Sequence, residues 1–461
     1  MGMISALFNN KIQSFEQVFG VRDITTSAMR EAITDWYNLY YQQTPTRQED
    51  PCQRLPVAIV SKLCKTVFSE YDASANKEGA KSEYLSKILL ALDKVRKKAM
   101  QSTLIGGECF LKPIFTAQGI CFCVIDRRNF VVLSRDEQGE ISDIGTCKKT
   151  IVGGKYYTLL ERRSVDYHGY LTIVSRLFCS QNENALGEEI SLNSLEKYAA
   201  IKPINRLPKP VYSLGLVPLQ VPVENCVDGS PDPVSVYAAA AGLIHLINVN
   251  ESQINGEFER GESRIIVSND LMSPDERGGF GFKDHVFSGL DHSPDELGVT
   301  IFSPAFREQS FLARKAEYLR NCESLIGLKR GILSEVEAAE RTATEVTSSA
   351  GDYNLTIIDF QQMWERAVRE AVRVCDILGQ IYKVCDTAPI NPEKDIAVSW
   401  GNGILYDENK VWSEYTGMVS SGLLKPEIAL AWYFDLPCDT PEDLMAIREK
   451  YMPELERLAE E

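Results

Sequence analysis

Two amphipathic segments separated by a β-type insert constrain the fold of this chain more than any other feature. The first, residues 234–260, opens with a small-residue run and has the apolar spacing of a helix. Two strand-like stretches, 265–267 and 299–302, follow, with a polar, glycine-rich passage between them. The second amphipathic segment covers about 308–328. This order predicts a long helical hairpin with a small module at its tip, which suits a wall or a lever better than a pocket.

The length and net charge of the chain limit its domain organisation and its binding partners. A chain of 461 residues exceeds the usual size of a single core, so two or more lobes are expected. The 44% hydrophobic and 25% charged residues are ordinary globular values. The formal net charge of -16 argues against tight, non-specific binding of nucleic acid, because lysine and arginine supply that affinity.

The cysteines and the apolar runs indicate the cellular compartment in which the protein is expected. The twelve cysteines do not fall in zinc-ligand spacings and no signal peptide precedes them, so reduced thiols in a cytosolic product are expected. The longest apolar run, 234–249, contains His245 and Asn248 and falls short of the roughly 20 apolar residues of a membrane span. We predict a packed helix there and no membrane association.

The N-terminal half predicts helices followed by strands. After an arm of about 20 residues, helices are expected near 27–40, 56–67 and from 82 onward. Alternating segments between glycine-containing turns then predict six strands of one antiparallel meander, covered on one face by the helices. These segments are 108–116, 119–127, 130–135, 140–152, 155–165 and 170–180. The proline-rich residues 181–232 read as a connector.

The C-terminal part predicts a long helix over about 355–384, a strand at 396–400 and two final helices. Pro426 lies in the first turn of one of them, and Thr440 with Pro441 and Asp443 is an N-terminal capping pattern for the other.

No motif indicates catalysis, so no catalytic residue, metal site or cofactor is expected. None of the four histidines lies in a hydrolase, kinase or zinc-protease signature. His245 is expected to be a satisfied core residue, and His285 and His292 to lie in a solvated loop rather than a metal site. Cys121 and Cys123 alternate along a strand and are expected to be buried.

The two amphipathic segments offer candidate subunit-interface residues. Small residues let helices approach closely, which fits either identical copies side by side or an ordinary core contact. They are Ala238, Ala239, Ala241 and Gly242. The second segment favours the interface, because Leu312, Ala316, Leu319, Cys322 and Ile326 form one stripe while charges of both signs occupy its other faces. Arg314, Glu317 and Arg320 are the charges expected to pair with a neighbour's flank.

A third cluster of charge follows the second segment. Lys329, Arg330 and Arg341 bracket Glu335, Glu337 and Glu340. The cluster is either a solvated helix end or a loop of alternating sign that points into a channel.

The order of these elements resembles the portal proteins of tailed bacteriophages, in particular a siphophage branch with a Thr-Ala-Thr-Glu-Val sequence after the second stem helix. The similarity spans about residues 20–455, and the order of short matches, rather than any one of them, is what is specific. The matching stretches are 36–40, 68–70, 104–107, 156–161, 234–267, 342–346, 420–427 and 432–433.

The resemblance implies an α+β, multidomain, portal-like subunit. Its parts would be a wing of helices and antiparallel β-sheet, a helical stem hairpin interrupted by a small α/β clip, a tunnel loop, a long wing or crown helix and a helical crown. The expected ranges are 1–232 for the wing, 233–261 and 307–330 for the stem, 262–306 for the clip, 331–346 for the tunnel loop, 347–388 for the long helix and 389–461 for the crown.

The resemblance also implies the function and the partners. Twelve subunits would form a ring at one capsid vertex of the virion, assembled in the host cytoplasm, through which double-stranded DNA enters and leaves. The implied partners are the terminase large subunit, head-completion or connector proteins, and the major capsid and scaffold proteins. Residues expected to face the DNA channel are Glu257, Glu259, Lys329, Arg330, Ser334, Glu335 and Arg341.

The charge is consistent with such a conduit, since strong phosphate contacts would hold DNA in place and an acidic wall lets it slide. Two other hypotheses stay open at this point. One is an unrecognised hydrolase or transferase, in which the β insert would cover a cleft with convergent titratable groups. The other is a monomeric structural adaptor, which predicts no closed assembly.

Overall fold

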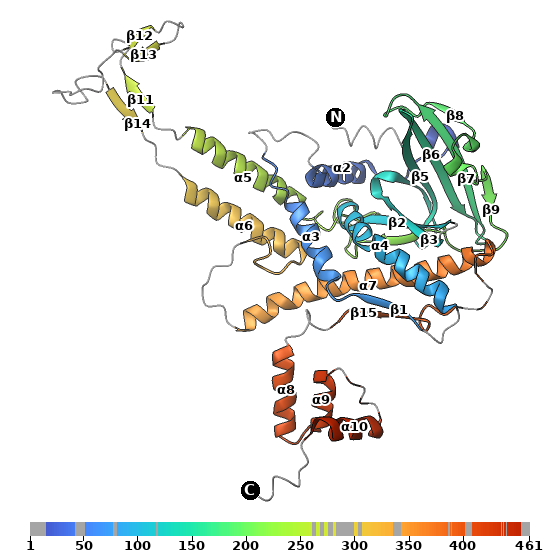
Figure 1. Ribbon diagram of the computed structural model, residues 1–461. Coiled ribbons are helices and arrows are strands. Elements are labelled where there is room, and N and C mark those ends of the chain that lie inside the picture. The colour runs from blue at the N-terminus through green and yellow to red at the C-terminus, as the bar shows by residue number, and fades with distance from the viewer. Residues whose placement is uncertain are drawn as a thin grey trace, which may run out of the picture. The chain divides into compact units, whose positions relative to one another are not determined.

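The computed structural model divides the chain into two compact units, residues 1–65 with 74–397 and residues 66–73 with 398–461. Helices and antiparallel sheets both contribute, which confirms the predicted α+β class. Figure 1 labels the elements. The structure describes residues 15–41, 51–76, 81–116, 119–260, 264–267, 272–274, 280–282, 299–302, 307–334, 343–385, 388, 390–401, 408–434, 436, 438 and 440–452.

Three helices begin the larger unit: α2 (Ser27–Tyr41), α3 (Leu55–Val67) and α4 (Ser82–Gly106). The hydroxyl of Thr26 caps α2 by accepting from the backbone N–H of Met29 at 3.1 Å. Gly107, with φ +83°, ends α4 and donates its N–H to the carbonyl of Thr103 at 2.8 Å. The side chain of Trp36 on α2 and that of Leu92 on α4 are fully buried, so the helices form one face of the core.

The six predicted strands exist within one residue of their predicted bounds, but they form two sheets rather than one meander. The first sheet has the order β10 (Val217–Gln220), β2 (Glu108–Thr116), β3 (Gly119–Asp126). The second has the order β4 (Phe130–Arg135), β5 (Ile141–Val152), β6 (Lys155–Val165), β7 (Leu171–Ser180), β8 (Glu188–Ile190), with β9 (Ile204–Arg206) also on β7.

The separation has a local cause. The 3-10 turn η1 (Arg127–Asn129) follows β3, and the carboxylate of Asp126 caps it by accepting from the N–H of Arg128 at 3.0 Å. This turn redirects the chain, so β4 pairs with β5 and not with β3. The first sheet is completed instead by β10, which lies in the predicted connector 181–232. That segment therefore supplies strands to both sheets, and the prediction of a simple connector is wrong.

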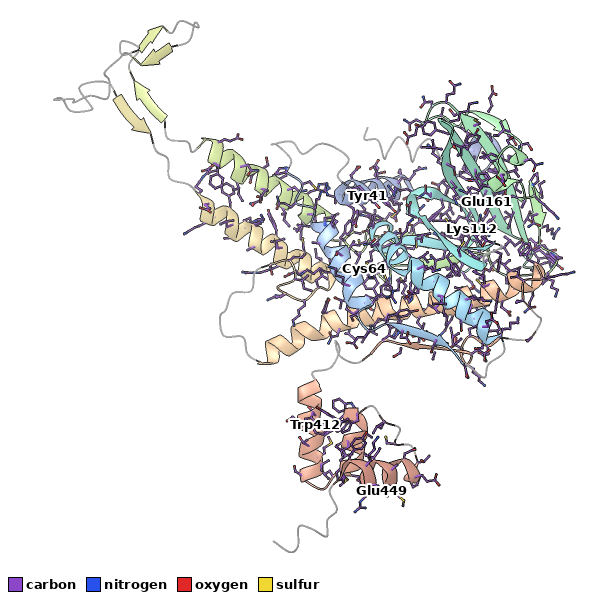
Figure 2. All side chains as sticks on the ribbon, viewed as in Figure 1. Tyr41, Cys64, Lys112, Glu161, Trp412 and Glu449 are labelled. Carbon is purple, nitrogen blue, oxygen red and sulfur yellow. The ribbon has the colours of Figure 1, made fainter. Side chains whose placement is uncertain are left out.

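A buried ionic cluster joins the two sheets. Lys112 on β2 contacts Glu161 on β6, with Nζ 2.6 Å from Oε2 (Figure 2). The guanidinium of Arg163 donates to the other oxygen of Glu161 at 2.5 Å and to the carbonyl of Leu214 at 2.9 Å. Both oxygens of this buried carboxylate are thus matched by cations, as a buried charge requires.

Residues 15–19 are helical and belong to the core rather than to a free arm, which corrects the prediction for this segment. Phe15 is buried and stacks on Phe19 with ring centroids 5.6 Å apart. It packs against Leu133 and Leu160 of the six-stranded sheet. A Cβ atom at Gly145 on β5 would collide with the Phe15 ring, so the glycine makes room for it.

The predicted hairpin is present as α5 (Ala241–Arg260) and α6 (Glu308–Ile326), which lie side by side in Figure 1. Between them in the chain, β11 (Arg264–Val267) pairs antiparallel with β14 (Val299–Phe302), as predicted. A second pair, β12 (Met272–Pro274) with β13 (Phe280–Phe282), lies inside the polar, glycine-rich passage, where no strand was predicted.

The first helix of the hairpin starts later than predicted. Residues 234–240 form successive turns, in which Ala238 donates to Ser235 and Ala240 donates to Tyr237. This stretch is tied to the end of α4, because the hydroxyl of Ser235 and the N–H of Val236 both donate to the carbonyl of Leu104 at 3.0 Å. Four residues of this stretch are therefore core residues in turns, namely Val234, Val236, Tyr237 and Ala240. Helix α5 begins only at Ala241.

The long helix α7 (Ala343–Ile381) begins twelve residues before its predicted start and buries the side chains of Trp364, Val368 and Cys375. It contacts α4, β2 and β10 and so supports the three-stranded sheet.

The second unit contains α8 (Glu408–Ser420), α9 (Pro426–Phe434) and α10 (Pro441–Tyr451), with α9 in contact with both others. The predicted capping pattern is confirmed, since Thr440 and Asp443 exchange side-chain and backbone hydrogen bonds. Helix α8 was not predicted. Its Trp412 packs against Tyr433 of α9 at a centroid distance of 4.7 Å. The paired strands β1 (Asp72–Ala75) and β15 (Ile396–Ser399) contain two of the three points at which the chain passes between units, and the third lies in α3.

Candidate functional site: the α5–α6 hairpin and the segment that follows it

Two ion pairs fix the register of the hairpin. The ammonium of Lys315 on α6 lies 2.6 Å from the carboxylate of Glu251 on α5. The guanidinium of Arg307, at the start of α6, binds both oxygens of Glu257 near the end of α5, at 3.0 and 2.9 Å. The hydrogen bonds and charge of Glu257 raise the pKa of Arg307. From the first ion pair to the second, the residue number rises on α5, from 251 to 257, and falls on the α6 side, from 315 to 307. The two helices therefore run antiparallel.

The inner side of the hairpin is apolar. Ile244, Ile247 and Ile254 of α5 and Cys322 and Ile326 of α6 are buried. The predicted stripe on α6 is therefore only partly correct, because Leu312 near the start of the helix is exposed, whereas Cys322 and Ile326 near its end are covered. The stripe passes from solvent to core along the helix.

The outer side of α5 carries an exposed apolar strip. Gly242, Leu246 and Val249 are spaced four and three residues apart and so share a helix face. Leu246 is 45% and Val249 50% exposed, and the position where Gly242 would carry a Cβ is open space. We refer to these three residues as the α5 strip. A strip of this kind can approach another helix closely.

The other predicted interface residues lie on and beside the hairpin. Ala238 is half-buried and Ala239 exposed, and both lie in the turns before α5 rather than on the helix. Ala241 is half-buried at the first position of α5. On α6, Arg314 and Glu317 are exposed and pair with each other at 2.6 Å, and Arg320 is exposed too. The outer face of α6 thus presents charges of both signs, as expected.

The segment after α6 folds back onto the last turn of the helix. Glu323, which is 0% exposed, accepts from the backbone N–H groups of Gly331, Leu333 and Ser334 at 3.1, 2.6 and 2.9 Å. Its second oxygen accepts from the hydroxyl of Ser334 at 2.7 Å. Gly327, with φ +74°, makes the reversal possible. The sequence analysis missed this role, because it expected the charged side chains of this helix to lie on its polar outer faces.

The residues expected to face a channel differ in how exposed their side chains are. Ser334 is only 9% exposed and bound to Glu323, so it is removed from the exposed candidates. Lys329, Arg330 and Glu259 are exposed, and Glu257 is largely covered by its pairing with Arg307. Glu335 and Arg341 lie outside the described residues.

Several expectations about single residues elsewhere are corrected. His245 is not a core residue, since its side chain is 51% exposed and lies 2.9 Å from the carboxylate of Asp35. Cys121 is exposed and Cys123 half-buried rather than buried. His285 and His292 are outside the described part of the chain. All twelve cysteines lie in the described part, and all are free thiols.

Among the residues that the structure describes, no three or more histidine, cysteine, aspartate or glutamate side chains are placed to hold a metal ion. None of the helices described combines the length and apolar character needed to cross a membrane. Comparisons of the chain with protein-family models and with curated proteins find no match.

Proposed function

We propose that this chain is the subunit of a phage portal: a ring-shaped, non-enzymatic channel at the capsid vertex that passes double-stranded DNA during packaging and ejection. The observation that carries the proposal is the α5–α6 hairpin, whose antiparallel helices are joined through paired strands β11 and β14. Two clamped helices with a β module between them have the element order of a portal stem and clip, followed by a long helix, α7.

A ring needs head-to-tail contacts between two different surfaces of the same subunit. The hairpin offers two such surfaces. One is the α5 strip, which is apolar and has no side chain at Gly242. The other is the mixed-charge outer face of α6 with Arg314, Glu317 and Arg320, whose long side chains have apolar stems that can cover such a strip.

The charge of the chain fits a conduit. At -16 per subunit, a ring repels the DNA backbone overall, and the exposed Lys329 and Arg330 beside α6 are too few to hold it. In this proposal the channel guides DNA without gripping it. The β insert would meet the terminase large subunit during packaging and head-completion or connector proteins afterwards, and the outer parts would meet the major capsid and scaffold proteins.

The direct test is the assembly state of the purified chain. Mass photometry and negative-stain electron microscopy of the purified chain should show closed rings with a central hole. In the virion, we expect the ring to have twelve subunits. A chain that stays monomeric at micromolar concentration under all conditions of salt and pH compatible with folding would contradict the proposal.

A further inference from the structure

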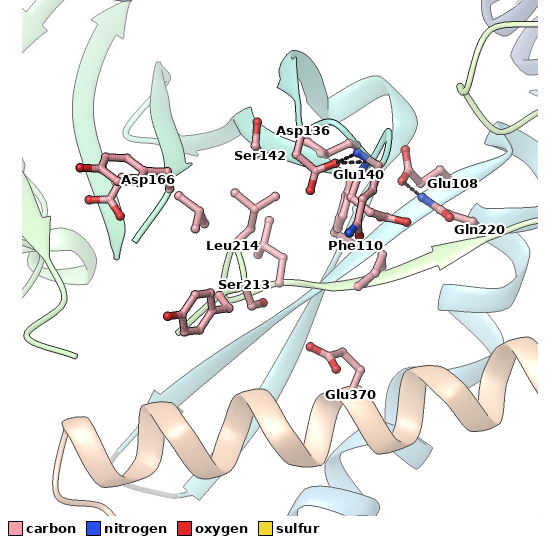
Figure 3. Close-up of a pocket in the computed structure, with 17 residues that line it drawn as sticks. Glu108, Phe110, Asp136, Glu140, Ser142, Asp166, Ser213, Leu214, Gln220 and Glu370 are labelled. Atoms are coloured by element: carbon pink, nitrogen blue, oxygen red, sulfur yellow. Dashed lines mark hydrogen bonds between the residues drawn. The ribbon is translucent and has the colours of Figure 1, made fainter. Parts of the chain in front are cut away.

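A cavity of about 640 Å³ lies in the larger unit, away from the hairpin (Figure 3). Its walls come from β2, β10, the β4–β5 and β6–β7 turns, the segment 212–216 and helix α7. Phe110, Ile141, Val165, Leu214 and Leu216 make much of it apolar. Glu108, Asp136, Glu140, Asp166 and Glu370 supply carboxylates, whereas its lining, as described, includes no lysine, arginine or histidine.

Two matching turns hold carboxylates at the rim. Asp136 accepts from the N–H groups of Gln138 and Glu140, both at 2.9 Å. Asp166 accepts in the same way from His168 and Tyr170, at 3.1 and 2.9 Å. Each turn thus fixes the position of its aspartate through backbone hydrogen bonds, and Asp166 is also paired with Arg206 at 2.8 Å. In Figure 3, Asp166 and Glu108 lie at opposite ends with Leu214 between them.

Glu108 is the observation that points to a ligand. It is 1% exposed, and its Oε1 accepts from the amide of Gln220 at 2.8 Å, but its Oε2 is buried and has no hydrogen-bond partner. Burial raises the pKa of this carboxyl, although Gln220 and Arg127 act to lower it. A buried oxygen without a donor is costly. A donor brought into the cavity would remove that cost.

The chemistry of the lining restricts what that donor is. A metal ion does not fit, since the described carboxylates do not cluster as ligands. With Oε1 held by Gln220, Glu108 offers a single oxygen, which suits a compact ammonium group better than the two-pronged guanidinium. The apolar walls between Glu108 and the rim suit an alkyl chain.

We infer that this cavity binds a protonated aliphatic amine, with one ammonium group at Glu108, its alkyl chain along the partly exposed Ile141 and Val165, and any second ammonium group at the rim near Asp136 and Glu140. The amine is either a free di- or polyamine or the lysine side chain of another polypeptide. This inference does not depend on the portal proposal.

The test is isothermal titration calorimetry on the full chain at fixed ionic strength, with spermidine, putrescine and an acetylated, amidated lysine as probes. Glu108→Gln should weaken binding of the preferred probe by about tenfold or more, as expected for one charge-assisted hydrogen bond. Glu137→Gln is the matched control, because Glu137 is exposed in the β4–β5 turn and does not line the cavity. It should leave the affinity within about twofold.

The probes separate the two sources. Tighter binding of spermidine or putrescine indicates a free polyamine, and tighter binding of the lysine derivative indicates a side chain of a partner. Glu140→Gln, at the exposed rim, serves as a second variant should Glu108→Gln unfold, and it should also weaken binding. The inference is overturned if no probe binds at millimolar concentration, or if Glu137→Gln weakens binding as much as the cavity variants do.

Discussion

At the scale of single residues, two buried carboxylates are stabilised by different means. Glu161 lies between Lys112 and Arg163 and is matched by opposite charge. Glu323 accepts hydrogen bonds from three backbone N–H groups and one hydroxyl. The first joins two sheets, and the second holds a segment onto a helix end. Removing the negative charge of Glu161 should therefore have a different effect from removing that of Glu323.

Glu161 should make the protein acid-sensitive. Burial alone would raise its pKa, but Arg163 and Lys112 outweigh burial and lower the pKa to about 2 from its usual 4.5. A carboxyl with a lowered pKa in the folded state contributes stability above its unfolded pKa and loses it as the pH falls. We expect the free energy of unfolding to fall between pH 4.5 and pH 2, and to fall less in Glu161→Gln. Urea unfolding at several pH values measures this, and equal slopes in both proteins would contradict it.

Neutralising Glu323 should release the segment that follows α6. Glu323→Gln keeps the shape but removes the negative charge that strengthens the hydrogen bonds from the three N–H groups and the Ser334 hydroxyl. We expect a loss of roughly 1–3 kcal/mol in the free energy of unfolding. Faster hydrogen exchange at Gly331, Leu333 and Ser334 should accompany it. Glu317→Gln, an exposed change on the same helix, is the control and should affect neither quantity strongly.

At the scale of elements, the sequence pattern predicts a strand or helix correctly where neighbouring residues in the chain determine it. The strands 108–116 and 155–165 were predictable because alternation and turn residues such as Gly153 and Gly154, both with positive φ, mark them directly. The start of α5 was not predictable, because apolar spacing does not distinguish a helix from turns tied to Leu104 of a distant helix.

The α5 strip leads to a prediction about assembly. Leu246→Glu places a charge in a surface that the proposed ring would bury, so we expect it to reduce ring formation while leaving the subunit folded. Leu90→Glu is the control, since Leu90 is an exposed leucine on α4, 65% exposed against 45% for Leu246. Mass photometry and circular dichroism report the two properties separately. Intact rings in Leu246→Glu would exclude the strip from the subunit interface.

At the scale of the whole molecule, the sites combine residues that no short pattern connects. The cavity brings Glu108, Asp136, Asp166, Leu214 and Glu370 together from five separate segments. The partner of β2 in the first sheet, β10, lies about a hundred residues further along the chain. Sequence reasoning therefore predicted the α+β class and most elements, but neither the division into two sheets nor the cavity, because both depend on long-range pairing.

The overall acidity of the chain leads to a prediction about DNA. Changing Glu335, Glu337 and Glu340 together to lysine replaces three negative charges by three positive ones in each subunit. We expect rings still to form, but DNA to be retained at low salt and packaging to slow, because added lysines neutralise phosphates. Filter binding at low and high salt, with an in vitro packaging assay, measures this. Normal packaging by the variant would show that this segment does not touch the DNA.

The paired clamps Lys315–Glu251 and Arg307–Glu257 have a mechanical consequence. For one rod of the hairpin to shear past the other by a single helical turn, about 5.4 Å, both clamps must open together. Small loads along the hairpin axis are therefore carried by the two rods jointly.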